Sequence, residues 1–193
     1  AGSTRSYPGT GTVWYNLIGT VNGTLSASSI GTTTAGTMTF DGVDDTLNIV
    51  LASLVSSDFT VIGVSGKVAG SNGRLISARS NNFLLGHHGT GSRKYYSEGW
   101  VASSYSDSSN DVHIYCGTGD ISGDVYSFRE DNVNYTQTAS GGSQGPNGFA
   151  LGSFQNGSEY GTGTITVLLV YNRVLTDAEI DQNFNAQKNR FGV

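Results

Sequence analysis

The chain has 193 residues, of which 36% are hydrophobic and only 13% charged, and its formal net charge is −5. This length suits one large all-β unit around a single core, so we expect one domain over residues 1–193. The acidic balance and the ten scattered Lys and Arg residues argue against nucleic-acid binding, which needs a phosphate-neutralising surface. The longest apolar run, 165–171, is too short to cross a bilayer, so we expect no membrane partner.

Short alternating or β-branched runs bounded by Gly, Asn, Asp or Ser recur along the chain and predict about a dozen strands, hence a two-sheet sandwich. The clearest runs are 37–40, 47–51, 59–64, 74–78, 83–87, 95–101, 113–116, 124–128, 133–138, 149–152 and 164–171. The polar stretches 103–111 and 140–147 predict surface loops. Cys116 is the only cysteine and lies in a strand-like run, so we interpret it as a buried structural thiol.

Strand alternation gives the last run two unequal faces. One face carries Ile165, Val167, Leu169 and Tyr171, whereas the other turns apolar late, at Leu168 and Val170. Such a strand is expected to be central in its sheet and to be covered on its second face. We therefore expect a following helix to cover Leu168 and Val170.

The sequence after this strand predicts that helix. Thr176 and Glu179 have the spacing of a capping box, and Leu175 and Ile180 occupy the positions of a hydrophobic staple. A helix over 177–189 follows, with its apolar stripe beginning at Ile180.

An acidic turn follows the first clear strand. Asp41, Asp44 and Asp45 are the densest group of carboxylates in the chain, and carboxylate oxygens are the ligands that Ca²⁺ prefers. The alternative is a plain turn in which the Asp side chains accept hydrogen bonds from nearby backbone amides. Spacing does not fix a further ligand, so both interpretations stay open.

Aromatic and imidazole side chains gather in the middle of the chain. Flat rings with polar tips are suited to sugars, which makes His87, His88, Tyr95 and Trp100 candidate glycan-binding residues. Alternation places Tyr95 and Trp100 on opposite faces, so some of these aromatics must belong to the core. His87 and His88 also point to opposite faces, which disfavours a shared metal ion.

Catalytic machinery is not visible. Glycan hydrolases on such folds use paired carboxylates. The four glutamates, Glu98, Glu130, Glu159 and Glu179, lie in four different segments, and the last belongs to the helix cap. No His-Glu-x-x-His helix or phosphate-cradling glycine loop occurs either. We therefore expect no enzymatic activity.

Two stretches resemble a known family. The opening GTVWYNL (11–17), with NGTL (22–25) and TFDGVDD (39–45), is similar to laminin-G-like jelly-roll modules of the concanavalin A-like superfamily. The ending, LVYNRVLTDAEI (169–180) followed by NFNAQK (183–188) and RFG (190–192), resembles the closing strand and helix of such modules in bacteriophage virion structural proteins. Asn16 stands where an Asp is common in many relatives.

The resemblance implies a fold and a role. The fold is an all-β, two-sheet antiparallel jelly-roll sandwich with one C-terminal helix. The role is a non-catalytic virion structural protein, as a capsid decoration or fibre module that contacts other virion subunits or copies of itself and adheres weakly to glycans. Ca²⁺ is bound by some members. The alternative is a free, secreted lectin-type module that binds carbohydrate outside any particle.

Overall fold

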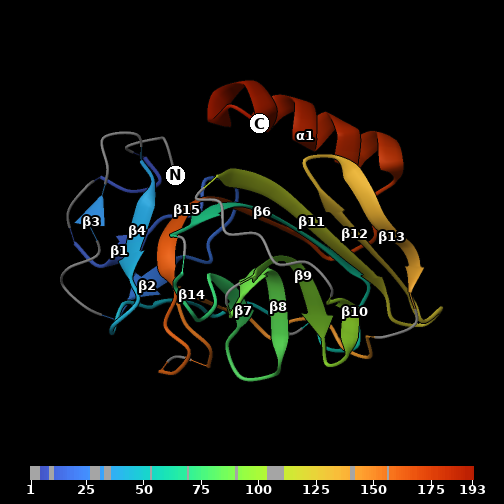
Figure 1. Ribbon diagram of the computed structural model, residues 1–193, viewed down its shortest axis with the longest axis horizontal. Coiled ribbons are helices and arrows are strands. Elements are labelled where there is room, and N and C mark those ends of the chain that lie inside the picture. Colours follow the sequence, from blue (N-terminus) through green and yellow to red (C-terminus); the bar gives the residue numbers. More distant parts are fainter. Residues whose placement is uncertain are drawn as a thin grey trace.

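The computed structural model shows two antiparallel sheets packed face to face, with one C-terminal helix lying against the outer side of one of them (Figure 1). The structure describes residues 5–8, 11–26, 31–32, 36–52, 54–68, 70–89, 91–103, 111–139, 142–155 and 157–193. This architecture confirms the predicted β-sandwich closed by a helix. No helix in these ranges is long and apolar enough to cross a membrane.

The sheets differ in their strand order. Within the described ranges, sheet A contains β1 (Val13–Trp14), β2 (Gly23–Leu25), β5 (Leu47–Ile49), β14 (Phe149–Leu151), β7 (Ile76–Ala78), β8 (Phe83–His88), β9 (Gly91–Ser97) and β10 (Trp100–Ala102). Sheet B contains β13 (Val133–Ala139), β12 (Val125–Glu130), β11 (Val112–Asp120), β6 (Phe59–Lys67), β15 (Thr162–Tyr171), β4 (Met38–Asp41) and β3 (Gly31–Thr32). Each predicted run overlaps at least one of these strands, whereas the short β1, β2 and β3 were not predicted.

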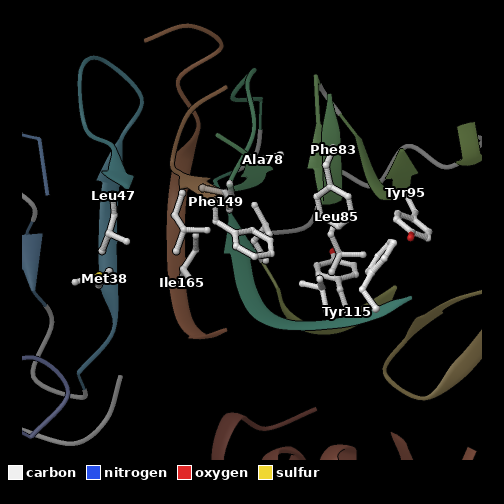
Figure 2. Packing of buried hydrophobic residues seen from close by; sticks show 14 of the residues in the cluster. Met38, Leu47, Ala78, Phe83, Leu85, Tyr95, Tyr115, Phe149 and Ile165 are labelled. Carbon is white, nitrogen blue, oxygen red and sulfur yellow. The ribbon is translucent and has the colours of Figure 1, made fainter. Parts of the chain in front are cut away.

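Aromatic rings fill the space between the sheets (Figure 2). Phe83 lies at the centre of this core, and its ring makes edge contacts with Phe59, Tyr95 and Phe149 at centroid distances of 5.8 to 6.1 Å. Edge-to-face pairs of this kind add to the free energy gained by burying the ring area. The core therefore holds both sheets in one fixed relative position.

The run predicted as one strand over 95–101 is a hairpin instead. β9 ends at Ser97, the chain turns at Glu98 and Gly99, and β10 returns along β9. Glu98 takes a left-handed conformation with φ 54°, which is uncommon outside glycine. The turn brings Trp100 directly opposite Tyr96 on the neighbouring strand. In the single strand that was predicted, the two residues would instead lie one after the other along one face.

A β-bulge in β15 overturns the predicted covering of its faces. The pairing with β6 shifts register between Ile165 and Val167, so these two residues point to opposite sides of sheet B. Ile165, Leu168 and Val170 face the core between the sheets. Val167, Leu169 and Tyr171 lie on the outer face with the helix residues. The prediction that the helix covers Leu168 and Val170 was wrong, because simple alternation does not reveal a bulge.

Helix α1 (Asp177–Phe191) begins as predicted and ends two residues later than predicted. The Thr176 hydroxyl accepts from the Glu179 amide, and the Glu179 carboxylate accepts from the Thr176 amide, which confirms the capping box. Its entry is fixed to sheet B by the buried Thr60 hydroxyl, which accepts from the Leu175 amide and donates to the Arg173 carbonyl, both at 2.9 Å.

The apolar stripe of α1 covers the outer face of sheet B. Ile180 is 4% exposed and packs with Ile62, Ile114 and Cys116, with Phe184 alongside. Burial raises the pKa of the Cys116 thiol to about 12, which agrees with its interpretation as a structural residue.

The predicted loops 103–111 and 140–147 overlap the described ranges to different extents. Of 103–111, residues 104–110 lie outside the described ranges. Of 140–147, residues 142–147 run without helix or strand, and the Gly145 amide and Pro146 carbonyl bond to the segment at Leu54 and Val55.

Candidate functional site

The outer face of sheet A, which points away from sheet B, carries an exposed aromatic pair. Tyr95 and Val101 belong to the core, so their neighbours Tyr96 and Trp100 face outward. The two outward rings pack edge to face across the hairpin, with centroids 5.0 Å apart and an interplanar angle of 80°. Trp100 remains 44% exposed, which leaves much of the indole accessible.

The histidine pair divides between the two sides of sheet A. His87 points inward, is 2% exposed and meets the Tyr115 ring at 5.2 Å. His88 points outward and lies 6.2 Å from the Trp100 ring, at an interplanar angle of 46°. Opposite orientation was predicted for these neighbours and is confirmed.

An ion pair borders the outward rings. Arg74 Nε donates to Glu159 Oε2 at 2.7 Å, and the same carboxylate oxygen lies 3.3 Å from His88 Nε2. The Arg74 side chain is only 7% exposed, whereas that of Glu159 is 40% exposed. The buried Arg74 side chain therefore holds the Glu159 carboxylate in place, and the carboxylate remains accessible to solvent.

The Arg74 guanidinium is fixed on several sides. Its Nη1 donates to Asn82 Oδ1 at 2.6 Å, and its Cζ lies 4.0 Å from the centre of the Phe154 ring. The backbone amide of Asn82 donates to Glu98 Oε1 at 2.6 Å. Glu159 itself has φ 45°, a left-handed conformation that persists only when its surroundings hold it.

We refer to this group as the outer-face patch. It comprises Arg74, His88, Lys94, Tyr96, Trp100 and Glu159. Burial and the neighbouring Arg74 lower the pKa of His88 below 6.5, and Glu159 opposes them. His88 is consequently neutral at pH 7, so its ring can both donate and accept a hydrogen bond.

Two of the four predicted glycan-binding residues are not accessible. Tyr95 is completely buried and its hydroxyl donates to the Thr118 carbonyl at 3.0 Å, and His87 lies between the sheets. The prediction was wrong for both, because alternation assigns them to the core face. His88 and Trp100 do come together. Tyr96 was missed, although alternation pairs it with Trp100.

The acidic turn brings its three carboxylates together. One oxygen each from Asp41, Asp44 and Asp45 lies within 4.8 Å of the other two. Asp41 Oδ1 accepts from the Val43 amide and Asp45 Oδ2 from the Asp41 amide, so the plain-turn hydrogen bonds are present as well. Burial raises the pKa of Asp45, and the neighbouring carboxylates raise it further.

A second titratable group comprises His113, Glu130 and Asp131, with one nitrogen or oxygen of each within 4.8 Å of the others. His113 Nδ1 and Asp131 Oδ2 are 2.6 Å apart, and Arg93 from sheet A forms an ion pair with the buried Glu130. Burial raises the pKa of Glu130, and Arg93 opposes the shift. Arg93 of sheet A pairs with Glu130 of sheet B, so we interpret the group as a link between the sheets.

The paired antiparallel sheets define the chain as a β-sandwich of the jelly-roll class. Trypanosoma rangeli sialidase in complex with sialic acid superposes with a TM-score of 0.70 at 18% identity, over 95% of this chain and 32% of that chain. The receptor binding domain of botulinum neurotoxin C/D mosaic serotype superposes with a TM-score of 0.63 at 9% identity, over 87% of this chain and 47% of that chain.

The binding domain of Paraclostridial Mosquitocidal Protein 1 is also similar, with a TM-score of 0.58 at 12% identity, over 79% of this chain and 44% of that chain. Such low identities establish the fold alone. This chain spans about a third of the length of the sialidase, 32%. No protein-family model matches the chain, and no curated protein sequence matches it either.

Proposed function

We propose that this chain is a non-catalytic glycan-binding module and that sugars contact the outer-face patch. The observation that carries the proposal is the exposed Trp100, flanked by His88 and Tyr96, beside the fixed Arg74–Glu159 pair. Flat rings suit the apolar face of a sugar, while fixed guanidinium, carboxylate and imidazole groups can bond its hydroxyls.

The patch favours weak binding at each site. It lies on an open face of sheet A, so a sugar there keeps much of its surface in water. Stacking on one or two rings, with a few hydrogen bonds, corresponds to roughly millimolar affinity. Firm adhesion then requires several copies, because linked weak sites act through effective concentration.

Lys94, a member of the outer-face patch, favours the binding of acidic sugars. Lys94 lies on the same strand face as Tyr96, and Lys67 donates to the Gly89 carbonyl at the neighbouring turn. Burial, followed by the nearby Lys94, lowers the pKa of Lys67. Lys67 is only 6% exposed and already donates to a carbonyl, so an anionic sugar would meet Lys94, which forms no ion pair with a carboxylate in the described ranges.

Several observations support a non-catalytic role. Both carboxylates near the rings are engaged internally, Glu98 by the Asn82 amide and Glu159 by Arg74. Ser143 has Gly-x-Ser-x-Gly spacing within 141–145, but no helix follows it, as a nucleophile elbow requires; the next element is the strand β14. A turnover that disappears in E159Q would contradict this part of the proposal.

The binding stated for the similar structures is compatible with the proposal. One structure is a sialidase in complex with sialic acid, and two are binding domains of toxins, one of them receptor-binding. We extend glycan or receptor binding to this chain only as part of the proposal, because the likeness is one of fold.

We further propose that the module is displayed in many copies on a virion surface, as a decoration or fibre part; the alternative is a secreted lectin-type module. Support comes from the family resemblance and from an exposed apolar loop at the edge of sheet A. Ile18 is 95% exposed and Leu17 55%, while Asn16 Oδ1 accepts from two amides and fixes the loop. Such a loop suits contact with another subunit.

The binding test uses the full chain and a matched pair of ligands, 3′-sialyllactose and lactose, titrated by NMR. We expect shifts of the Trp100 indole signal with sialyllactose at millimolar concentration, and weaker ones with lactose. W100A should lower the affinity at least about tenfold. Y15A removes an aromatic residue that is 47% exposed and outside the patch, and should leave binding unchanged.

The outcomes separate the parts of the proposal. Equal affinities for the two sugars would remove the acidic preference but keep the site. Equal effects of W100A and Y15A, or no shift with either sugar or with a wider glycan array, would reject the outer-face patch. Fixed-stoichiometry detection of the chain in purified particles would support virion display, and its absence from them would favour the secreted alternative.

A further inference from the structure

His88 lies where the exposed rings of the outer-face patch meet its ion pair. Its Nε2 is 3.3 Å from Glu159 Oε2, the oxygen that also accepts from Arg74 Nε. Its ring lies 6.2 Å from the Trp100 ring, and 32% of its side chain is exposed. A proton gained or lost by His88 therefore changes the charge of the surface that a sugar would contact.

Positive groups outnumber negative ones around His88. Arg74, which precedes β7, and Lys94 from β9 disfavour a proton on the ring, whereas Glu159 favours it. The titratable and aromatic groups that contact His88 or its neighbours are Arg74, Lys94, Tyr96, Trp100, Glu159 and Lys67, whose ammonium donates to the Gly89 carbonyl. With a neutral imidazole, the patch carries two positive groups and one negative group. A proton on His88 raises its net charge from +1 to +2.

His88 is the patch member whose charge responds to pH near neutrality. Unperturbed carboxyl, amino and guanidinium groups keep their charge between about pH 5 and 8, whereas an imidazole changes its charge there. The chain has three histidines. His87 points inward and is 2% exposed, and His113 is bonded to Asp131 in the group that links the sheets. A change in the charge of the outer-face patch in this range is therefore a change at His88.

A carboxylate on a bound sugar would favour the imidazolium form of His88. Opposite charges about 4 Å apart in water attract each other strongly enough to change an equilibrium constant about fivefold. Binding linkage is reciprocal, so a sugar that raises the affinity of His88 for a proton is itself bound more tightly once His88 is protonated. A neutral sugar has no such attraction to the added charge.

We propose that proton uptake by His88 regulates the outer-face patch, so that acidic glycans are bound more tightly in acidic than in neutral surroundings. The proposal rests on the proposed glycan-binding function and adds a regulation of the same site. Burial, then Arg74, and more weakly Lys94, lower the pKa of His88 in the free protein, so the change in affinity falls on the acidic side of neutrality.

The test measures the affinity of the full chain for 3′-sialyllactose and lactose at about pH 7.5 and about pH 5, by the NMR shift of the Trp100 indole. The carboxylate of 3′-sialyllactose stays ionised over this range. Its affinity should rise about threefold or more on acidification, whereas that of lactose should change less than about twofold. Saturation with 3′-sialyllactose should in turn raise the titration midpoint of His88 by about half a pH unit, the reciprocal of a threefold gain.

Two variants identify the group that responds to pH. H88Q keeps a polar side chain that takes up no proton, so its affinity for 3′-sialyllactose should not rise on acidification, whatever the absolute affinity is. K94Q removes a fixed positive charge from the patch, and should lower this affinity at both pH values while keeping the rise. His88 and Lys94 are both partly exposed, so both variants should fold.

The outcomes separate this regulation from the proposed function. Trp100-dependent binding of 3′-sialyllactose with equal affinity at the two pH values would overturn the regulation and keep the function. A rise that persists in H88Q, or an equal rise for lactose, would also overturn it, because the cause would then not be the charge of His88. No binding of either sugar at either pH would reject the function and the regulation together.

Discussion

The two outer faces of the sandwich are used in opposite ways. The outer face of sheet B is apolar and is covered by α1, with Val167 and Ile180 at the contact. The outer face of sheet A carries the outer-face patch, in which Trp100 is 44% exposed and Arg74 forms an ion pair. Both faces follow the same two-residue alternation, so only the chemistry of the outward residues distinguishes a face that stabilises the fold from one that can bind a ligand.

Removing the helix should have the largest effect. A chain ending at Arg173 loses Leu175 and Ile180, each buried to 4% exposure, and uncovers Ile62 and Ile114 beneath them. Two buried aliphatic side chains contribute about 3 to 6 kcal/mol, so the melting temperature should fall by roughly 10 °C or more. Calorimetry and size-exclusion chromatography check this. A monomer that melts within a few degrees of the full chain would show that the helix does not stabilise the sandwich.

Single substitutions sharpen the comparison of faces. I180A should cost about 2 to 4 kcal/mol, because it leaves a cavity beneath α1. W100A should change the free energy of unfolding by less than about 1 kcal/mol, because Trp100 is 44% exposed and lies outside the core. Urea midpoints with unchanged m-values measure both. Equal losses would mean that the outer face of sheet A is also structural.

The smallest effect concerns the protonation of His88. Its pKa is lowered by burial and then by Arg74, so its NMR titration midpoint should lie below 6.5. Since the folded state takes up this proton less readily than the unfolded state, its contribution to stability is present above pH 6.5 and is lost as the pH falls below it. E159Q should move the midpoint lower still, because Glu159 raises the pKa.

E98Q is the matched control for that titration. Glu98 lies near the patch and bonds the Asn82 amide, a contact that a Gln oxygen can retain. The His88 midpoint should stay unchanged in E98Q. A His88 titration midpoint above 6.5 in the parent chain would contradict the lowering of its pKa by burial and Arg74. The same shift of that midpoint in E98Q and E159Q would contradict the contact between Glu159 and His88.

Local signals predicted much of the fold. The capping box at Thr176 and Glu179 fixed the start of α1, because it depends on four neighbouring residues. The bulge between Ile165 and Val167 could not be predicted, since it depends on how β15 pairs with β6. The β9–β10 hairpin was missed because Glu98 adopts a turn conformation that is usual for Gly or Asn rather than Glu.

The candidate site was less predictable than the fold. His88 and Trp100 were found from residue type, and Tyr96 was recoverable from alternation. The partnership of Arg74 with Glu159 left no local signal, because 85 positions separate them and only the folded loop before β15 brings them together. Residue type alone also selected Tyr95, whose hydroxyl proved to be satisfied inside the core.

The position of Cys116 has a practical consequence. It is the only cysteine of the chain, and it lines a small cavity under α1 together with Ile62, Ile114 and Ile180. A thiol reagent cannot reach it while the helix is docked, and burial keeps it protonated. The rate at which a disulfide-forming dye labels the native protein therefore reports transient undocking of α1. No engineered probe is needed, because the covered face of sheet B already carries one.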